Sequence, residues 1–162
     1  VARSVEGFSE ALKRSETSRI RLALENSAGQ GSCLAGGIEE WGELVHGLPA
    51  SRRAACLDTA HAFAAGFDLR TGEGREQLFN ALARWLGWDS LMLLHANDSK
   101  TECGSRVDRH EHLGLGKIGT RGLRAFLSDR RLRGIPRIGE LPPGEREDRK
   151  NLAFLRSCCG AS

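Results

Sequence analysis

Four short apolar runs, each ending in an acid or a histidine, constrain the fold of this chain more than any other feature. The runs are RLALE at 21–25, AACLD at 54–58, LMLLH at 91–95 and PRIGE at 136–140. Longer segments with helical apolar spacing lie before, between and after them, an alternation that is typical of βα units. The pattern therefore predicts an α/β fold with a parallel sheet of four strands.

The spacing of apolar residues predicts where these elements lie. We expect strands at 19–26, 54–58, 90–98 and 135–140, and helices at 5–13, 38–48, 73–86, 121–129 and 146–158. A chain of 162 residues with 40% hydrophobic and 28% charged residues is ordinary for one soluble domain. Parallel βα units form open doubly wound sheets or closed (β/α)₈ barrels, and four units are half of the barrel number.

Each predicted strand ends on a side chain that can bind a metal ion. The final residues of the four runs are Glu25, Asp58, His95 and Glu140. In parallel βα folds, the carboxyl ends of the strands meet on one face, where the functional loops also gather. A charged group that directly follows a buried strand is costly unless it has a partner. We therefore expect these four side chains to share a site.

The loops after the second and third strands add His61, Asp108 and His110. The seven candidates are three imidazoles and four carboxylates, a mixture that favours Zn²⁺ first and Mn²⁺ second. Seven ligands exceed the needs of one tetrahedral ion, so we expect two or three ions. Two ions about 4 Å apart are a recurring device for phosphoester hydrolysis. Cys56 does not match the ligand positions, and we expect it to pack in the interior.

Charge and cysteine content narrow the possible partners and compartments. The net charge is only +3, but cations outnumber acids over residues 100–133, which suits a phosphate-bearing partner. The alternative for residues 124–133 is a solvated helix face. Five cysteines without a C-x-x-C spacing do not form a disulfide framework, which favours a reducing compartment. The sequence contains no apolar run of about 18 residues, the length that a membrane-spanning helix needs, so it predicts no membrane span.

Four segments together resemble one family. They are LENSAGQG at 24–31, CLDTAHAFAAGFDLRT at 56–71, LLHANDSK at 93–100 and GSRVDRHEHLGLGKIG at 104–119. These motifs resemble those of endonuclease IV, the zinc-dependent apurinic/apyrimidinic (AP) endonucleases. The resemblance runs from about residue 20 to residue 155. It implies a (β/α)₈ TIM barrel that binds up to three zinc ions and double-stranded DNA containing abasic sites.

The resemblance also implies a role for each candidate residue. Glu25 matches a bridging carboxylate, and Glu25 and Glu140 match catalytic positions. The second zinc site would take Asp58, His95 and Glu140, and the third would take His61, Asp108 and His110. DNA contacts would come from Lys100, Ser105, Arg106 and Arg109. The implied reaction is hydrolysis of the DNA phosphodiester on the 5′ side of an abasic site, in base excision repair.

The family barrel has eight strands, whereas only four are expected here. We therefore expect residues 1–162 to be the C-terminal part of a single barrel domain, without the N-terminal half and its two zinc-binding histidines. Full activity would then need that half, and the open sheet edges favour self-association. The expected location is the cytoplasm in a bacterial cell, or the nucleus or mitochondrion in a eukaryotic one.

Two other functions remain open from the sequence. Metal-dependent sugar isomerases and epimerases also place Glu, Asp and His at the ends of barrel strands. The chain could instead be an inactive half-barrel remnant that binds metal without catalysis.

Overall fold

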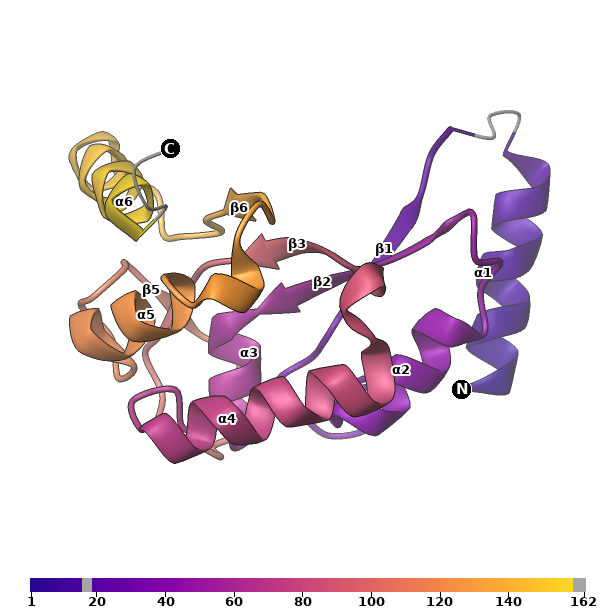
Figure 1. Ribbon diagram of the computed structural model, residues 1–162, viewed down its shortest axis with the longest axis horizontal. Helices are drawn as coiled ribbons and strands as arrows, with labels where there is room; N and C mark the ends of the chain where they lie inside the picture. Colours follow the sequence, from indigo (N-terminus) through magenta and orange to yellow (C-terminus); the bar gives the residue numbers. More distant parts are fainter. Residues whose placement is uncertain (16–18, 159–162) are drawn as a thin grey trace.

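The structure is a computed structural model that describes residues 1–15 and 19–158, so Cys159 lies outside the described residues (Figure 1). Its main sheet contains four parallel strands in the order β1-β2-β3-β6. The strands are β1 (Leu22–Glu25), β2 (Arg53–Asp58), β3 (Leu91–His95) and β6 (Arg137–Ile138). The predicted α/β class, with a four-stranded parallel sheet, is confirmed.

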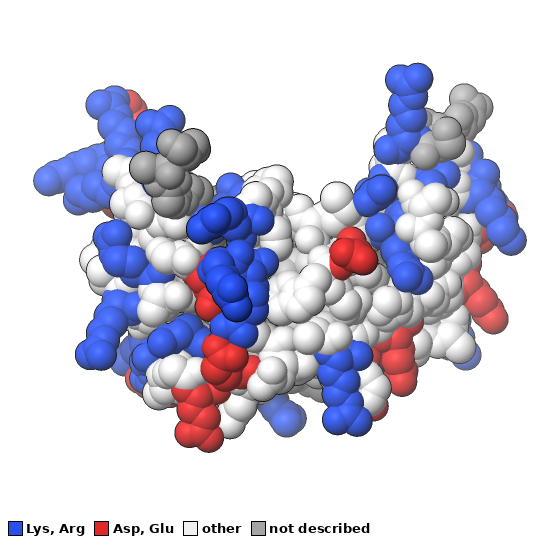
Figure 2. Space-filling view, viewed as in Figure 1, with Lys and Arg blue, Asp and Glu red and all other residues white. Residues whose placement is uncertain are grey.

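Six α-helices accompany the sheet in the described part of the chain. They are α1 (Ala2–Arg14), α2 (Ile38–His46), α3 (Thr59–Ala64), α4 (Gly72–Ala81), α5 (Gly119–Leu127) and α6 (Glu145–Cys158). Helices α2 and α4 lie on one side of the sheet, while α1 and α6 lie at its two ends (Figure 1). Between these two ends the space-filling view shows a hollow in the surface (Figure 2).

The core lies between the sheet and helices α2 and α4. Trp41, Phe63, Phe79 and Phe126 are among its largest fully buried side chains, and Phe79 stacks on Phe126 with ring centroids 5.1 Å apart. Helix α2 lies against the π-helical turn η1 (Leu82–Leu86) that follows α4. A Cβ at Gly42 would lie 2.3 Å from the backbone oxygen of Trp85, so only glycine allows this approach.

A bulge in β3 decides which of its side chains face the open side of the sheet. Ala55 pairs with Leu91, but Cys56 pairs with Leu93, so β3 has one extra residue at Met92. Beyond the bulge, Asp58 pairs with His95. Side chains alternate between the two faces of a strand, so one extra residue exchanges the faces of every residue beyond it. This exchange places His95 on the same face as Asp58.

The elements differ from the sequence-based expectations in four places. The predicted helix at 73–86 is α4 followed by the π-helical turn η1. The predicted strand at 135–140 is only two residues long, and Pro136 has no N–H to extend its ladder. Helix α3 was not expected. Nor was the antiparallel pair of β4 (Asp98–Ser99) and β5 (His110–Glu111).

Candidate metal centre

Asp58 ends β2 and begins helix α3 at the same time. Its carboxylate accepts a hydrogen bond from the backbone N–H of His61 at 2.8 Å, which caps the helix. Two buried asparagines fix its position. Asn97 Nδ2 donates to Asp58 Oδ2 at 2.5 Å, and the backbone N–H of Asp58 donates to Asn26 Oδ1 at 2.7 Å. The Asp58 side chain is fully buried and therefore has a single defined orientation.

Glu25, Asp58, His95 and Glu140 form the first cluster of possible ligands. Each offers one atom within 4.8 Å of the others. His95 Nδ1 lies 2.9 Å from Glu25 Oε1 and 2.9 Å from Glu140 Oε2. The pKa of Glu25 is raised above its usual value, because burial and the nearby Asp58 raise it by more than the hydrogen bond with His95 lowers it. A cation among these carboxylates would offset their mutual repulsion and the cost of their burial.

Asp58, His61 and His110 form the second cluster, again with one atom each within 4.8 Å of the others. Asp108 joins it, because its two carboxylate oxygens lie 3.2 Å from His61 Nε2 and 3.2 Å from His110 Nε2. The two Nε2 atoms are 3.4 Å apart. Burial opposes charge on His61, but Asp58 and Asp108 outweigh it and raise the pKa of His61.

The other ring nitrogens of both histidines contact backbone carbonyls. His61 Nδ1 lies 2.8 Å from the Asn26 oxygen, and His110 Nδ1 lies 2.7 Å from the Glu140 oxygen. A carbonyl at Nδ1 fixes the tautomer and leaves Nε2 as the metal-binding nitrogen. Both Nε2 atoms then face Asp108, as a shared metal ion would require.

The loop that carries Asp108 and His110, which we call the ligand loop (residues 100–118), is folded around the buried carboxylate of Asp98. The pKa of Asp98 is raised above its usual value, because burial raises it by more than the hydrogen bonds from the surrounding backbone amides lower it. Five backbone N–H groups donate to this carboxylate at 2.8–3.3 Å, namely those of Ser99, Gly114, Gly116, Ile118 and Gly119. Asp98 therefore holds both ends of the ligand loop.

Sequence reasoning did not identify the residues that support the ligands. Asn26, Asn97 and Asp98 are buried, and they fix the strand ends and the ligand loop. The only signal available was their position next to candidate ligands, since Asn26 follows Glu25 and Asn97 lies two residues past His95.

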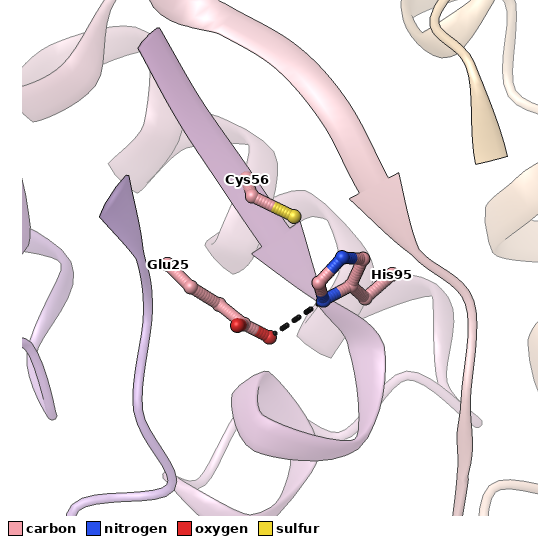
Figure 3. Close-up of side chains that lie close together, drawn as sticks. All are labelled: Glu25, Cys56 and His95. Atoms are coloured by element: carbon pink, nitrogen blue, oxygen red, sulfur yellow. Dashed lines mark hydrogen bonds and ion pairs between the residues drawn. The ribbon is translucent and has the colours of Figure 1, made fainter. Parts of the chain in front are cut away.

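Cys56 is buried in the interior, as expected, and its side chain also lies beside two of the candidate ligands. Its sulfur forms a third possible ligand group with Glu25 and His95, again within 4.8 Å, and points toward the His95 ring (Figure 3). Burial, with Glu25 and Asp58 adding to it, raises the pKa of the thiol to about 12. The signal that was available is the alternation of strand faces, because Cys56 and Asp58 are two residues apart.

The candidate DNA-binding residues lie on or beside the ligand loop. Lys100, Arg106 and Arg109 are exposed. The backbone of Arg106 has a φ of +54°, which residues other than glycine rarely adopt. Ser105 is half-buried and donates to the hydroxyl of Thr101 at 3.0 Å, so its contact is within the loop. Lys and Arg side chains are numerous at the end of the molecule that carries α5 and α6 (Figure 2).

The residues present fit a divalent metal ion. The two clusters contain only imidazole nitrogens and carboxylate oxygens, which suit zinc and manganese. The fully buried carboxylate of Asp58 belongs to both clusters, so one side chain could contact two neighbouring ions. A parallel βα sheet with candidate metal ligands at its strand ends is the arrangement expected of a metal-dependent βα barrel.

Comparison with known sequences identifies the family. The sequence model described as "Xylose isomerase-like TIM barrel" matches residues 1–158, and the chain belongs to this family. Among solved structures, endonuclease IV from Thermus thermophilus superimposes with a TM-score of 0.84 at 39% identity. That match covers 95% of this chain and 55% of the other. The resemblance to endonuclease IV is therefore confirmed.

Curated relatives give the same result. A protein named "Probable endonuclease 4" from Cenarchaeum symbiosum is 42% identical over 143 residues, which are 87% of this chain and 51% of the relative. An "Apurinic-apyrimidinic endonuclease" from Caenorhabditis elegans is 42% identical over 131 residues, or 80% of this chain and 33% of the relative. The chain spans about half the length or less of these relatives and corresponds to their C-terminal part.

Within residues 1–15 and 19–158, no helix has both the length and the apolar composition needed to cross a membrane.

Proposed function

We propose that this chain is the C-terminal part of a zinc-dependent AP endonuclease, which hydrolyses the DNA phosphodiester 5′ to abasic sites in base excision repair. The observation that carries the proposal is the convergence of all seven predicted ligands into two adjoining clusters that share Asp58. The names of relatives about 40% identical to the chain support the same reaction. No observation on the described residues favours the isomerase alternative.

The roles of the residues follow from where they lie. In this proposal Glu25, Asp58, His95 and Glu140 hold one ion, and His61, Asp108 and His110 hold a second with Asp58 beside it. Zinc at such a centre lowers the pKa of water and stabilises charge on a departing oxygen. Glu140 is about half exposed at its side chain, so it can reach a bound phosphate, whereas Glu25 lies deeper against His95 and His61.

DNA would approach the ligand loop. The exposed Lys100, Arg106 and Arg109 can neutralise backbone phosphates on either side of the lesion, a contact that weakens with salt. An abasic nucleotide leaves the helix at low cost because it has no base to unstack. Positive charge beside the metal ligands therefore suits a substrate whose scissile group is a phosphodiester.

A chimeric enzyme tests the proposal. The described fold matches endonuclease IV of Thermus thermophilus over 95% of this chain, so residues 1–158 can replace the corresponding part of that protein. We expect the chimera to nick a duplex that contains one abasic site, on the 5′ side of that site. A chelator should abolish the nicking. The 162-residue chain alone should be much slower, because it lacks the other half of the barrel.

Matched variants of the chimera distinguish the loss of one metal ligand from a general loss of folding. His110→Gln should remove nicking and lower the zinc content by about one ion per chain. His112→Gln should leave both unchanged, because His112 contacts Asn151 instead of the clusters. A folded, zinc-loaded chimera that leaves abasic duplexes intact would contradict the proposal, and turnover of a ketose by that chimera would favour an isomerase.

A further inference from the structure

We propose that the chain has a second way of holding a metal ion, in which the sulfur of Cys56 joins Glu25 and His95 to bind a soft divalent cation. This position adjoins the cluster of Glu25, Asp58, His95 and Glu140 and shares two of its side chains. A soft ion and a hard ion would therefore compete for Glu25 and His95. The inference concerns metal selectivity and does not depend on the DNA substrate.

The register of the sheet brings the three side chains together. Glu25 on β1 pairs directly with Cys56 on β2, and His95 on β3 pairs with Asp58, two residues farther along β2. Cys56 and Asp58 face the same side of the strand, at a spacing of about 6.6 Å. Cys56 therefore contributes its sulfur from the layer beneath Asp58, and the sulfur points toward the His95 ring (Figure 3).

The distances suit one ion after a small movement. The three ligand atoms lie within 4.8 Å of one another. Around a tetrahedral ion with bonds of about 2.0–2.3 Å, ligand atoms lie roughly 3.3–3.8 Å apart. Rotation of the Glu25 carboxylate, which already lies 2.9 Å from His95, can supply much of the remaining approach. The backbone of three paired parallel strands holds the other two ligands in place.

Charge balance also favours this position for an ion deep in the fold. Cys56 is only 2% exposed, so an ion bound to it is largely removed from water. Glu25 and a Cys56 thiolate together carry two negative charges, which neutralise a divalent cation, and the thiol proton leaves to solvent as the ion binds. The neighbouring cluster has three carboxylates and leaves one excess negative charge. A neutral group is cheaper to bury than a charged one.

Ligand softness then decides which ion takes which position. Thiolates prefer soft ions, whereas carboxylate oxygens prefer hard ions such as Mn²⁺. Cd²⁺ should therefore bind with Cys56, and Mn²⁺ should bind with Asp58 and Glu140. Because Glu25 and His95 serve both positions, occupation by Cd²⁺ would displace the ion held by Glu25, Asp58, His95 and Glu140. Cys56 would thus make the centre sensitive to soft metals.

Titration of the 162-residue chain with Cd²⁺ tests the inference. A thiolate ligand gives an ultraviolet charge-transfer band, which we expect to rise with the first equivalent. Cys56→Ser should remove that band and weaken Cd²⁺ binding by about 100-fold. This is the upper end of the loss that follows when a residue that only hydrogen-bonds to a metal ligand is replaced. Mn²⁺ binding should stay unchanged. The control Cys103→Ser changes a half-buried thiol outside the clusters and should leave the band intact.

X-ray absorption of the unmodified chain with one equivalent of Cd²⁺ covers the case in which Cys56→Ser does not fold. One sulfur together with oxygen and nitrogen neighbours would support the inference. A shell of oxygen and nitrogen only, or of several sulfurs, would overturn it. An undiminished charge-transfer band in a folded Cys56→Ser chain would overturn it as well.

Discussion

Replacing Asp98 with alanine should unfold the ligand loop without breaking the sheet. The substitution removes the acceptor of five backbone N–H groups at the two ends of the loop. Each buried N–H without a partner costs about 1–3 kcal/mol. The full sum is not realised, because the loop can open to water. We expect a loss of about 3–5 kcal/mol, which is the cost of breaking a buried charged interaction.

Urea unfolding followed by circular dichroism measures this loss. Hydrogen exchange should show fast amides at Gly114 and Gly116 while those of β2 stay protected. Zinc content should fall by one ion, because Asp108 and His110 lose their fixed positions. Asp98→Asn keeps one acceptor oxygen, so its free energy of unfolding should lie between those of the unmodified chain and of Asp98→Ala. The control Asp89→Ala removes an exposed acid and should change stability by less than about 0.5 kcal/mol.

A loss below about 1 kcal/mol in Asp98→Ala, with slow exchange retained in the ligand loop, would refute this reasoning. That result would mean that the loop is held by its other contacts, such as the antiparallel pair of β4 and β5.

Three further predictions concern packing, charge and metal. Gly42→Ala should cost about 1–3 kcal/mol in a thermal melt, because its Cβ would overlap a backbone oxygen, while Gly7→Ala in the open part of α1 should not destabilise. Arg131 lowers the pKa of Asp129, so the folded chain releases that proton more readily than the unfolded chain. The resulting stability is present at neutral pH and is lost as the pH falls below about 4, and Arg131→Ala, unlike Arg133→Ala, should flatten this acid limb of the stability curve. Zinc at about 100 times its dissociation constant should stabilise the chain by about 2.7 kcal/mol, and an unchanged melting temperature would argue against a metal site in the folded state.

The sequence predicted the parallel sheet and the convergence of the candidate ligands because both depend on local order. An apolar run that ends in Asp58 or His95 identifies a strand and its functional end at once, and βα connectivity sends those ends to one face. The clusters that the structure brings together contain the same seven residues.

The details that escaped prediction depend on contacts between distant segments. Helix α3 is too short to show an apolar period, and it begins where Asp58 caps it. Asp98 resembles any other acid in a loop until four amides from a later segment, together with that of Ser99, surround its carboxylate. The position of Cys56 depends on the register between β1 and β2, which no single segment encodes.

The extra residue at Met92 makes this protein unequally tolerant of genetic change. A substitution at Met92 keeps the chain length, so it leaves His95 paired with Asp58. Deletion of any one residue between the start of β3 and His95 would restore strict alternation and turn the imidazole toward the helices. Among descendants of this gene, β3 should therefore vary freely in composition at the bulge but never in length.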